Sequence, residues 1–154
     1  MPEIAKPVTI TKKPGTVHSF FALKFHDGDE DREKVEKIEA ALNQAGITIT
    51  LMARDVEKWG EAVIPEGKKL MRDYAFPAMQ QCDCNIIEFS EKGVGLGMNA
   101  GFCYAIKKPV FIIAKTGSDI SSTMADVAEK VIFYDTPEDL VEPFKKIAKE
   151  LLGK

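Results

Sequence analysis

Five short runs of apolar residues divide the chain, and helical patterns fill the segments between them. The runs cover residues 19–25, 47–52, 84–89, 109–114 and 131–134. Continuous apolar runs of this length are typical of strands that helices cover on both faces. Apolar residues at helical spacing predict helices over 31–45, 68–81, 124–130 and 137–152, with a further helix of small residues before 109–114. Pro77 should kink or locally break its helix.

Strands that alternate with helices favour a doubly wound α/β fold, here a single-domain parallel sheet of five strands. We expect the flavodoxin-like (Rossmann-like) strand order 2-1-3-4-5. In that order the ends of the first and third strands meet at the topological switch point, where ligands bind. Residues 21–24 and 88–97 should therefore face one crevice.

Gly93, Gly95 and Gly97 follow the third predicted strand. Glycine permits positive φ and close approach to a ligand, and the N-terminal NH groups of the next helix would point to the same place. The stretch is a candidate anion or sugar site, although glycines that only let the helix pack on its strand would give the same spacing. It matches neither the dinucleotide fingerprint nor the P-loop, so no cofactor is predicted.

Composition and charge narrow the possible partners. The 154 residues, 45% hydrophobic and 29% charged, are ordinary for one globular domain. A net charge of -3 argues against a nucleic acid polymer and favours a small molecule. No run is long enough for a membrane helix, and residues 1–15 lack the apolar core of a signal peptide, so we expect a cytoplasmic protein without membrane contact.

The remaining sequence signals are structural. The three cysteines have no paired CxxC or His cluster beside them, which predicts reduced core thiols and no metal site. Residues 1–17 carry prolines among lysines and predict an extended N-terminal arm, mobile or draped on a partner, ahead of a domain over 18–154. The long polar connection after the second strand is a candidate lid, in which Trp59 could stack on a base or staple the loop down.

The third and fourth strands and the glycines between them resemble the nucleoside 2-deoxyribosyltransferases and the related 2'-deoxynucleoside 5'-phosphate N-hydrolases. In that family a strand ending in an acidic or hydroxyl residue leads to a glycine-rich loop and then to a strand beginning Lys-Pro-Val. Glu88, Ser90, residues 95–101 and residues 108–110 fall on this pattern. The resemblance extends from about Ser19 to the C-terminus and implies the same fold, a nucleoside or nucleotide partner, and a homodimer or higher homo-oligomer.

The resemblance also implies which residues contact the nucleoside. The first strand matches the family's pocket strand at Phe20, Phe21, Ala22 and Lys24. We expect one of the two phenylalanines to contact the ligand and the other to pack. The other implied binding residues are Ser90, Gly93, Gly95, Gly97, Met98 and Ser122, the last of which matches a serine that reaches the phosphate across the dimer interface in the N-hydrolases. Gly93 replaces their phosphate-binding serine, which argues against a required 5'-phosphate.

Asn99 occupies the position of the family's catalytic glutamate. That glutamate attacks C1' of the deoxynucleoside, and an amide cannot, because its oxygen is a poor and uncharged nucleophile. The family's helix aspartate falls on Ala75, with Asp73 the nearest carboxylate. The candidate catalytic residues are therefore Asn99, Asp73 and Glu88, the last as a base, a sugar ligand or a charge buried by pairing. The chain is expected either to act on the N-glycosidic bond of a (deoxy)nucleoside or nucleotide, or to bind a nucleotide without catalysis.

Overall fold

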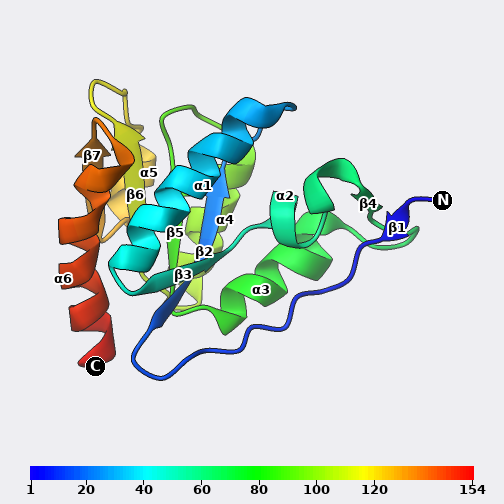
Figure 1. Cartoon of the computed structure of the whole chain (residues 1–154), viewed down its shortest axis with the longest axis horizontal. Helices are drawn as coiled ribbons and strands as arrows, with labels where there is room; N and C mark the ends of the chain where they lie inside the picture. The colour runs from blue at the N-terminus through cyan, green and yellow to red at the C-terminus, as the bar shows by residue number, and fades with distance from the viewer.

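Five parallel strands form the central sheet of the computed structural model, which describes residues 1–154 (Figure 1). They are β2 (Val17–Leu23), β3 (Ile47–Thr50), β5 (Cys84–Glu88), β6 (Val110–Lys115) and β7 (Lys130–Tyr134). The sheet order is β3-β2-β5-β6-β7. Counted along these five strands it is 2-1-3-4-5, which confirms the predicted fold.

Helices cover both faces of this sheet, which explains why its strands are apolar on both sides. Helices α1 (Asp29–Gln44) and α6 (Val141–Leu152) pack on one face, and α3 (Phe76–Gln81), α4 (Val94–Ala105) and α5 (Ser122–Val127) pack on the other. Successive side chains of a strand point to opposite faces, so Phe21 is buried with α1 and α6 while Phe20 is buried with α3 and α4. None of these helices has both the length and the apolar character needed to cross a membrane.

The predicted break at Pro77 is confirmed. Residues Leu70–Ala75 form the π-helix η2, and the chain changes to α-helix at Phe76, with Pro77 in the first turn of α3. Proline has no N–H to donate, and the first turn of a helix needs none. Pro137 likewise lies in the first turn of a helix, the 3-10 helix η3 (Pro137–Leu140) that precedes α6.

The N-terminal arm is extended, and its own chain holds it. Strand β1 (Glu3–Ile4) pairs in parallel with β4 (Ala62–Val63), and the Ala5 N–H donates to the Val63 carbonyl at 2.8 Å. Further along, the Ile10 N–H donates to Oε1 of Gln81 on α3 at 3.0 Å. The expectation of an arm that is mobile or draped on a partner is therefore corrected, because its backbone groups find partners on β4 and α3.

The long connection after β3 is folded. It contains α2 (Met52–Asp55), the 3-10 turn η1 (Lys58–Gly60) and β4. Trp59 packs 5.4 Å from the Phe25 ring, and the Arg32 guanidinium lies 4.8 Å above its indole. Trp59 therefore staples the connection onto the end of β2 and onto α1.

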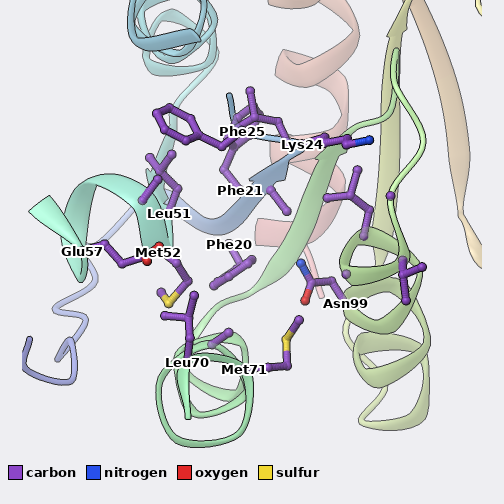
Figure 2. Close-up of a pocket in the computed structure, with 18 residues that line it drawn as sticks. Phe20, Phe21, Lys24, Phe25, Leu51, Met52, Glu57, Leu70, Met71 and Asn99 are labelled. Atoms are coloured by element: carbon purple, nitrogen blue, oxygen red, sulfur yellow. The ribbon is translucent and has the colours of Figure 1, made fainter. Parts of the chain in front are cut away.

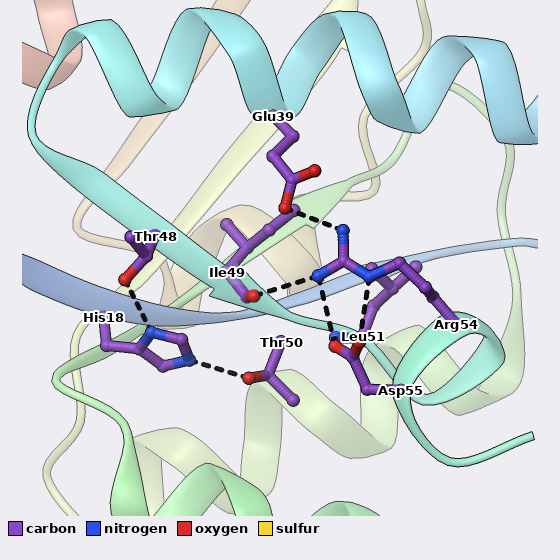
Figure 3. A network of polar contacts seen from close by, with 8 residues as sticks. All are labelled: His18, Glu39, Thr48, Ile49, Thr50, Leu51, Arg54 and Asp55. Carbon is purple, nitrogen blue, oxygen red and sulfur yellow. Dashed lines mark hydrogen bonds and ion pairs between the residues drawn. The ribbon is translucent and has the colours of Figure 1, made fainter. Parts of the chain in front are cut away.

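Two polar networks fix the edge of the sheet beside this connection (Figure 3). Arg54 donates to Glu39 at 2.7 Å, to both carboxylate oxygens of Asp55, and to the Ile49 carbonyl at 3.2 Å. The His18 ring lies between the hydroxyl groups of Thr48 and Thr50, each 2.7 Å from a ring nitrogen. Since these groups are partly buried, the bonds offset the cost of removing them from water.

Candidate functional site

A pocket of about 490 Å³ lies beside the carboxyl ends of β2 and β3 and the N-terminus of α4 (Figure 2). The residues after β3 form one wall, the first turn of η2 forms another, and α4 closes the third side. Of the 18 lining residues 13 are hydrophobic, so the pocket is an apolar cleft with few polar groups. Its position at the switch point between β2 and β5 is the one that the strand order predicts.

Seven of the sequence-predicted residues line this pocket: Phe20, Phe21, Ala22, Lys24, Gly93, Gly95 and Asn99. Both phenylalanines reach the wall, because the pocket wraps around the end of β2. Which of them contacts a ligand stays a prediction. The structure does not bring Ser90, Glu88, Asp73, Gly97, Met98 or Ser122 into the lining.

Asn99 is the polar group that α4 directs into the pocket. Asn99 as a whole is 6% exposed, and its amide oxygen Oδ1 is buried without a hydrogen-bond partner. Figure 2 shows the amide turned from the helix toward Phe20. Buried polar atoms in folded proteins are almost always paired, so the amide of Asn99 has an unmet hydrogen bond at the edge of the cleft.

Glu88 lies outside the pocket, toward α1, and its carboxylate is fully engaged. Oε1 accepts from the Ser90 N–H at 2.7 Å, and Oε2 accepts from the Ser90 and Tyr134 hydroxyl groups and lies 3.2 Å from Nζ of Lys34. The Ser90 hydroxyl in turn accepts from the Lys115 N–H at 2.8 Å. Burial, followed by the bond to Glu88, raises the pKa of Tyr134. Of the three alternatives for Glu88, the structure shows the charge buried by pairing.

Asp73 also faces away from the pocket. Its carboxylate accepts from the Lys69 N–H at 2.8 Å and pairs with Arg72 at 3.0 Å. The bond from Arg72, and next the bond from Lys69, lower the pKa of Asp73. Ala75 lines the pocket from the same helix, so the position that carries the family's aspartate offers no carboxylate here.

The three other predicted residues outside the lining lie on α4 and α5. A Cβ on Gly97 would meet Sδ of Met124 at 4.0 Å, so this glycine faces α5. Met98 is 51% exposed on the outer side of α4, and Ser122 is exposed at the start of α5. None of the three can contact a ligand in this pocket without a change in structure or a second copy of the chain.

The glycine-rich stretch is helical sooner than expected. Gly93 is the N-cap of α4 with extended backbone, the helix begins at Val94, and Gly95 and Gly97 lie within it. None of the three has a positive φ. The expected glycine turn with positive φ is therefore wrong, and the start of α4 itself forms the pocket wall.

Glu57 is a pocket residue that sequence reasoning missed. It lines the wall between α2 and η1, and no other carboxylate lines the pocket. Its half-buried side chain forms no ion pair, and burial raises its pKa. Hydrophobic periodicity cannot show which side chains of an irregular connection face a pocket. The one sequence signal that pointed to Glu57 was its position shortly after the second strand, whose carboxyl end lies near the switch point.

The fold and the pocket define a flavodoxin-like α/β protein with a ligand cleft at its switch point. Neither the family models nor the sequences of characterised proteins give a match to this chain. Among solved structures, a conserved protein from Enterococcus faecalis has a TM-score of 0.61 at 13% identity, over 86% of this chain and 99% of its own.

Two further solved structures carry descriptions of an activity. One is a 2-deoxyribosyltransferase from Bacillus psychrosaccharolyticus, with a TM-score of 0.57 at 18% identity over 80% of this chain and 91% of that one. The other is a CMP N-glycosidase from Clostridium botulinum, with a TM-score of 0.56 at 12% identity over 83% and 99%. These likenesses show a shared fold.

Proposed function

We propose that this chain binds a nucleoside or nucleotide beside Asn99 and acts on its N-glycosidic bond. The observation that carries the proposal is the amide group of Asn99, which lines an apolar cleft at the switch point and whose oxygen Oδ1 is buried without a hydrogen-bond partner. An unpaired buried acceptor costs about 1–3 kcal/mol. A sugar hydroxyl or a base N–H that donated to this oxygen, after a rotation of the amide that turns it to the cleft, would recover this cost on binding.

The rest of the lining suits the same ligand. Phe20, Met52 and Met71 offer flat or adaptable apolar surface for a base. Gly95 has an ordinary helical backbone, and a Cβ there would meet Cε of Met71 at 3.8 Å, an ordinary contact. Because glycine weakens a helix, and neither φ nor crowding requires it at Gly95, its presence supports close approach by a ligand.

The lining favours a nucleoside over a 5'-phosphate. Lys24 is the one cationic residue that lines the pocket, and its ammonium group lies 3.3 Å from a carboxylate oxygen of Glu91. Gly93 has no hydroxyl group to offer a phosphate. A single cation that is already paired provides little compensation for the charge of a phosphate.

The reaction would have to avoid a glycosyl-enzyme ester, because Asn99 cannot attack C1'. Direct attack by water gives a hydrolase, and direct attack by a second base gives a transferase. The second candidate function is binding without turnover. The same Asn99 favours it, since the amide keeps a hydrogen-bonding group and lacks the nucleophile.

We also propose that two copies associate through the outer face of α4. Val94 and Met98 lie one turn apart on this helix and are 85% and 51% exposed, and such neighbouring apolar side chains are typical of interfaces. Ser122 lies on the neighbouring helix α5 and would join the interface. Sedimentation of the wild type and of Met98→Glu tests the association, and a wild-type monomer at micromolar concentration would refute it.

One set of measurements separates the two candidate functions. Thermal shifts with nucleosides, nucleotides and their deoxy forms measure binding, and chromatography of released base measures cleavage. We expect binding by the wild type, and we expect Asn99→Glu to gain cleavage, because a carboxylate would stand where the family has its nucleophile. Asn43→Glu, the same change at an exposed position on α1, is the control. Binding without cleavage in both proteins would favour the non-catalytic role, and no thermal shift with any compound would refute the proposal.

A further inference from the structure

We infer that Glu57 is the acid–base residue of this pocket and serves the leaving base while Asn99 holds the sugar or the attacking water. The inference rests on the proposed function. It assigns catalysis to a carboxyl group on the connection after β3, where neither the sequence pattern nor the family resemblance places one. Figure 2 shows Glu57 and Asn99 entering the pocket from different walls.

The charged residues near Glu57 pair with other groups, so its carboxyl is available to a ligand. Lys24, the other charged residue in the lining, is paired with Glu91. On α2, Arg54 and Asp55 bind each other, and Arg54 also binds Glu39. Lys58 is exposed. With no cation beside it, the Glu57 carboxyl faces the apolar lining, where the charged form is disfavoured.

The backbone around Glu57 is fixed from three directions. Its N–H donates to the Met52 carbonyl at 2.9 Å, and its own carbonyl accepts from the N–H groups of Gly60 at 2.9 Å and Ala62 at 3.0 Å. These bonds tie the residue to α2 on one side and to β4 on the other. The side chain is therefore presented to the pocket by an ordered wall.

The two residues that follow Glu57 have strained backbone. Lys58 and Trp59 have φ values of 50° and 57°, in the left-handed region that residues with a Cβ rarely adopt. Each such residue costs about 1–3 kcal/mol, and such strain clusters at functional sites, where the surrounding structure maintains it. Here the packing of Trp59 on Phe25 and Arg32 maintains it. The turn directs the chain back toward β4 immediately after Glu57.

A carboxyl in this position can supply the proton that the reaction needs. Burial raises the pKa of Glu57, so more of the group stays protonated toward neutral pH than in water. As the bond from C1' to the base nitrogen breaks, its electron pair goes to the base, which takes the proton of Glu57. Water then bonds through oxygen to C1' and returns a proton to the Glu57 carboxylate, which restores the starting state.

The test compares Glu57→Gln with Glu61→Gln, which changes an exposed glutamate of the same connection. Release of base from 2'-deoxynucleosides is measured between pH 5 and 9, in the wild-type and the Asn99→Glu backgrounds. General acid catalysis contributes about 10²–10⁴-fold, so Glu57→Gln should lower kcat by that factor and change KM by less than about threefold. The fall of kcat with rising pH, which reports loss of the acid's proton, should disappear. Glu61→Gln should behave as the parent protein.

A second substrate separates an acid from a structural support. A 4-nitrophenyl 2-deoxyriboside has a leaving group that needs no proton, so Glu57→Gln should cleave it within about threefold of the parent rate. Equal losses on both substrates, or unchanged cleavage of deoxynucleosides, would overturn the role of Glu57 and leave the proposed function standing. If neither background cleaves either substrate, the proposed activity and the role of Glu57 both fail.

Discussion

Replacing Asn99 by leucine should increase the free energy of unfolding and abolish ligand binding. The amide oxygen of Asn99 is buried without a partner, whereas a leucine has the same branching and would extend its larger, apolar side chain into the adjoining cleft. Removing the unpaired acceptor recovers about 1–3 kcal/mol, and imperfect packing of the new side chain costs less than about 1.5 kcal/mol. We therefore expect a net gain of about 1–2 kcal/mol in the free energy of unfolding.

For a chain of this length, 1 kcal/mol corresponds to about 2–4 °C in Tm. Asn99→Leu should accordingly raise Tm by about 2–8 °C in a calorimetric scan and raise the urea midpoint without changing the slope of the transition. The same variant should show no thermal shift with the nucleosides that stabilise the wild type. Asn99→Ala separates the two terms, since it removes the amide and leaves a cavity.

The reasoning fails if Asn99→Leu lowers Tm. That result would mean either that the larger leucine is overpacked or that a buried water satisfies the amide oxygen; if Asn99→Ala also lowers Tm by more than its cavity explains, the water is indicated and the argument for a ligand donor loses its basis. It fails in a different way if Tm rises and the ligand still binds, because the pocket would then not use Asn99.

Three further predictions concern stability and reactivity. Burial lowers the pKa of His18, so the folded state binds the His18 proton more weakly than the unfolded chain does. The free energy of unfolding should therefore fall as the pH drops from about 6.5 through the lowered pKa. If His18→Gln shows the same pH profile as the wild type, this prediction is wrong. Arg54→Lys should lose the forked hydrogen bonds to Asp55 and lower the free energy of unfolding, measured in urea, by about 1–2 kcal/mol. A variant as stable as the wild type would show that the network makes no net contribution to stability. Burial raises the thiol pKa of Cys84 to about 12 and that of Cys103 to about 11. Neither thiol should therefore react with a disulfide reagent at pH 8 until urea unfolds the chain. Rapid labelling of the native protein would refute their placement in the core.

The sequence was sufficient to predict the sheet and much of the pocket, because both follow from patterns within single segments. The five apolar runs determine the strands, their alternation with helices determines the order, and the order determines where the cleft lies. Pro77 was enough to predict a break, although not that a π-helix would precede it. Phe20 and Asn99 were expected from the family resemblance, since their segments match its motifs, and both line the pocket at the switch point.

Contacts between distant segments account for what the sequence did not reveal. Glu88 is removed from the pocket by Tyr134 and Lys34, which belong to β7 and α1, and nothing in its own segment predicts that pairing. The pairing of β1 with β4 involves two residues on each side, too few to give a periodic pattern. Glu57 is oriented by left-handed backbone at Lys58 and Trp59, a conformation that no residue type there would suggest.

The pairing of β1 with β4 connects the N-terminal arm to the pocket wall at Glu57. Ala5 binds the carbonyl of Val63, and the neighbouring Ala62 binds the carbonyl of Glu57, so the first residues of the chain lie two hydrogen bonds from the candidate acid. Thermodynamic linkage is reciprocal: if docking of the arm favours the ligand, the ligand favours docking of the arm by the same factor. Occupancy of the pocket should then be readable at the N-terminus, as slower proteolysis within the first residues in the presence of a bound nucleoside.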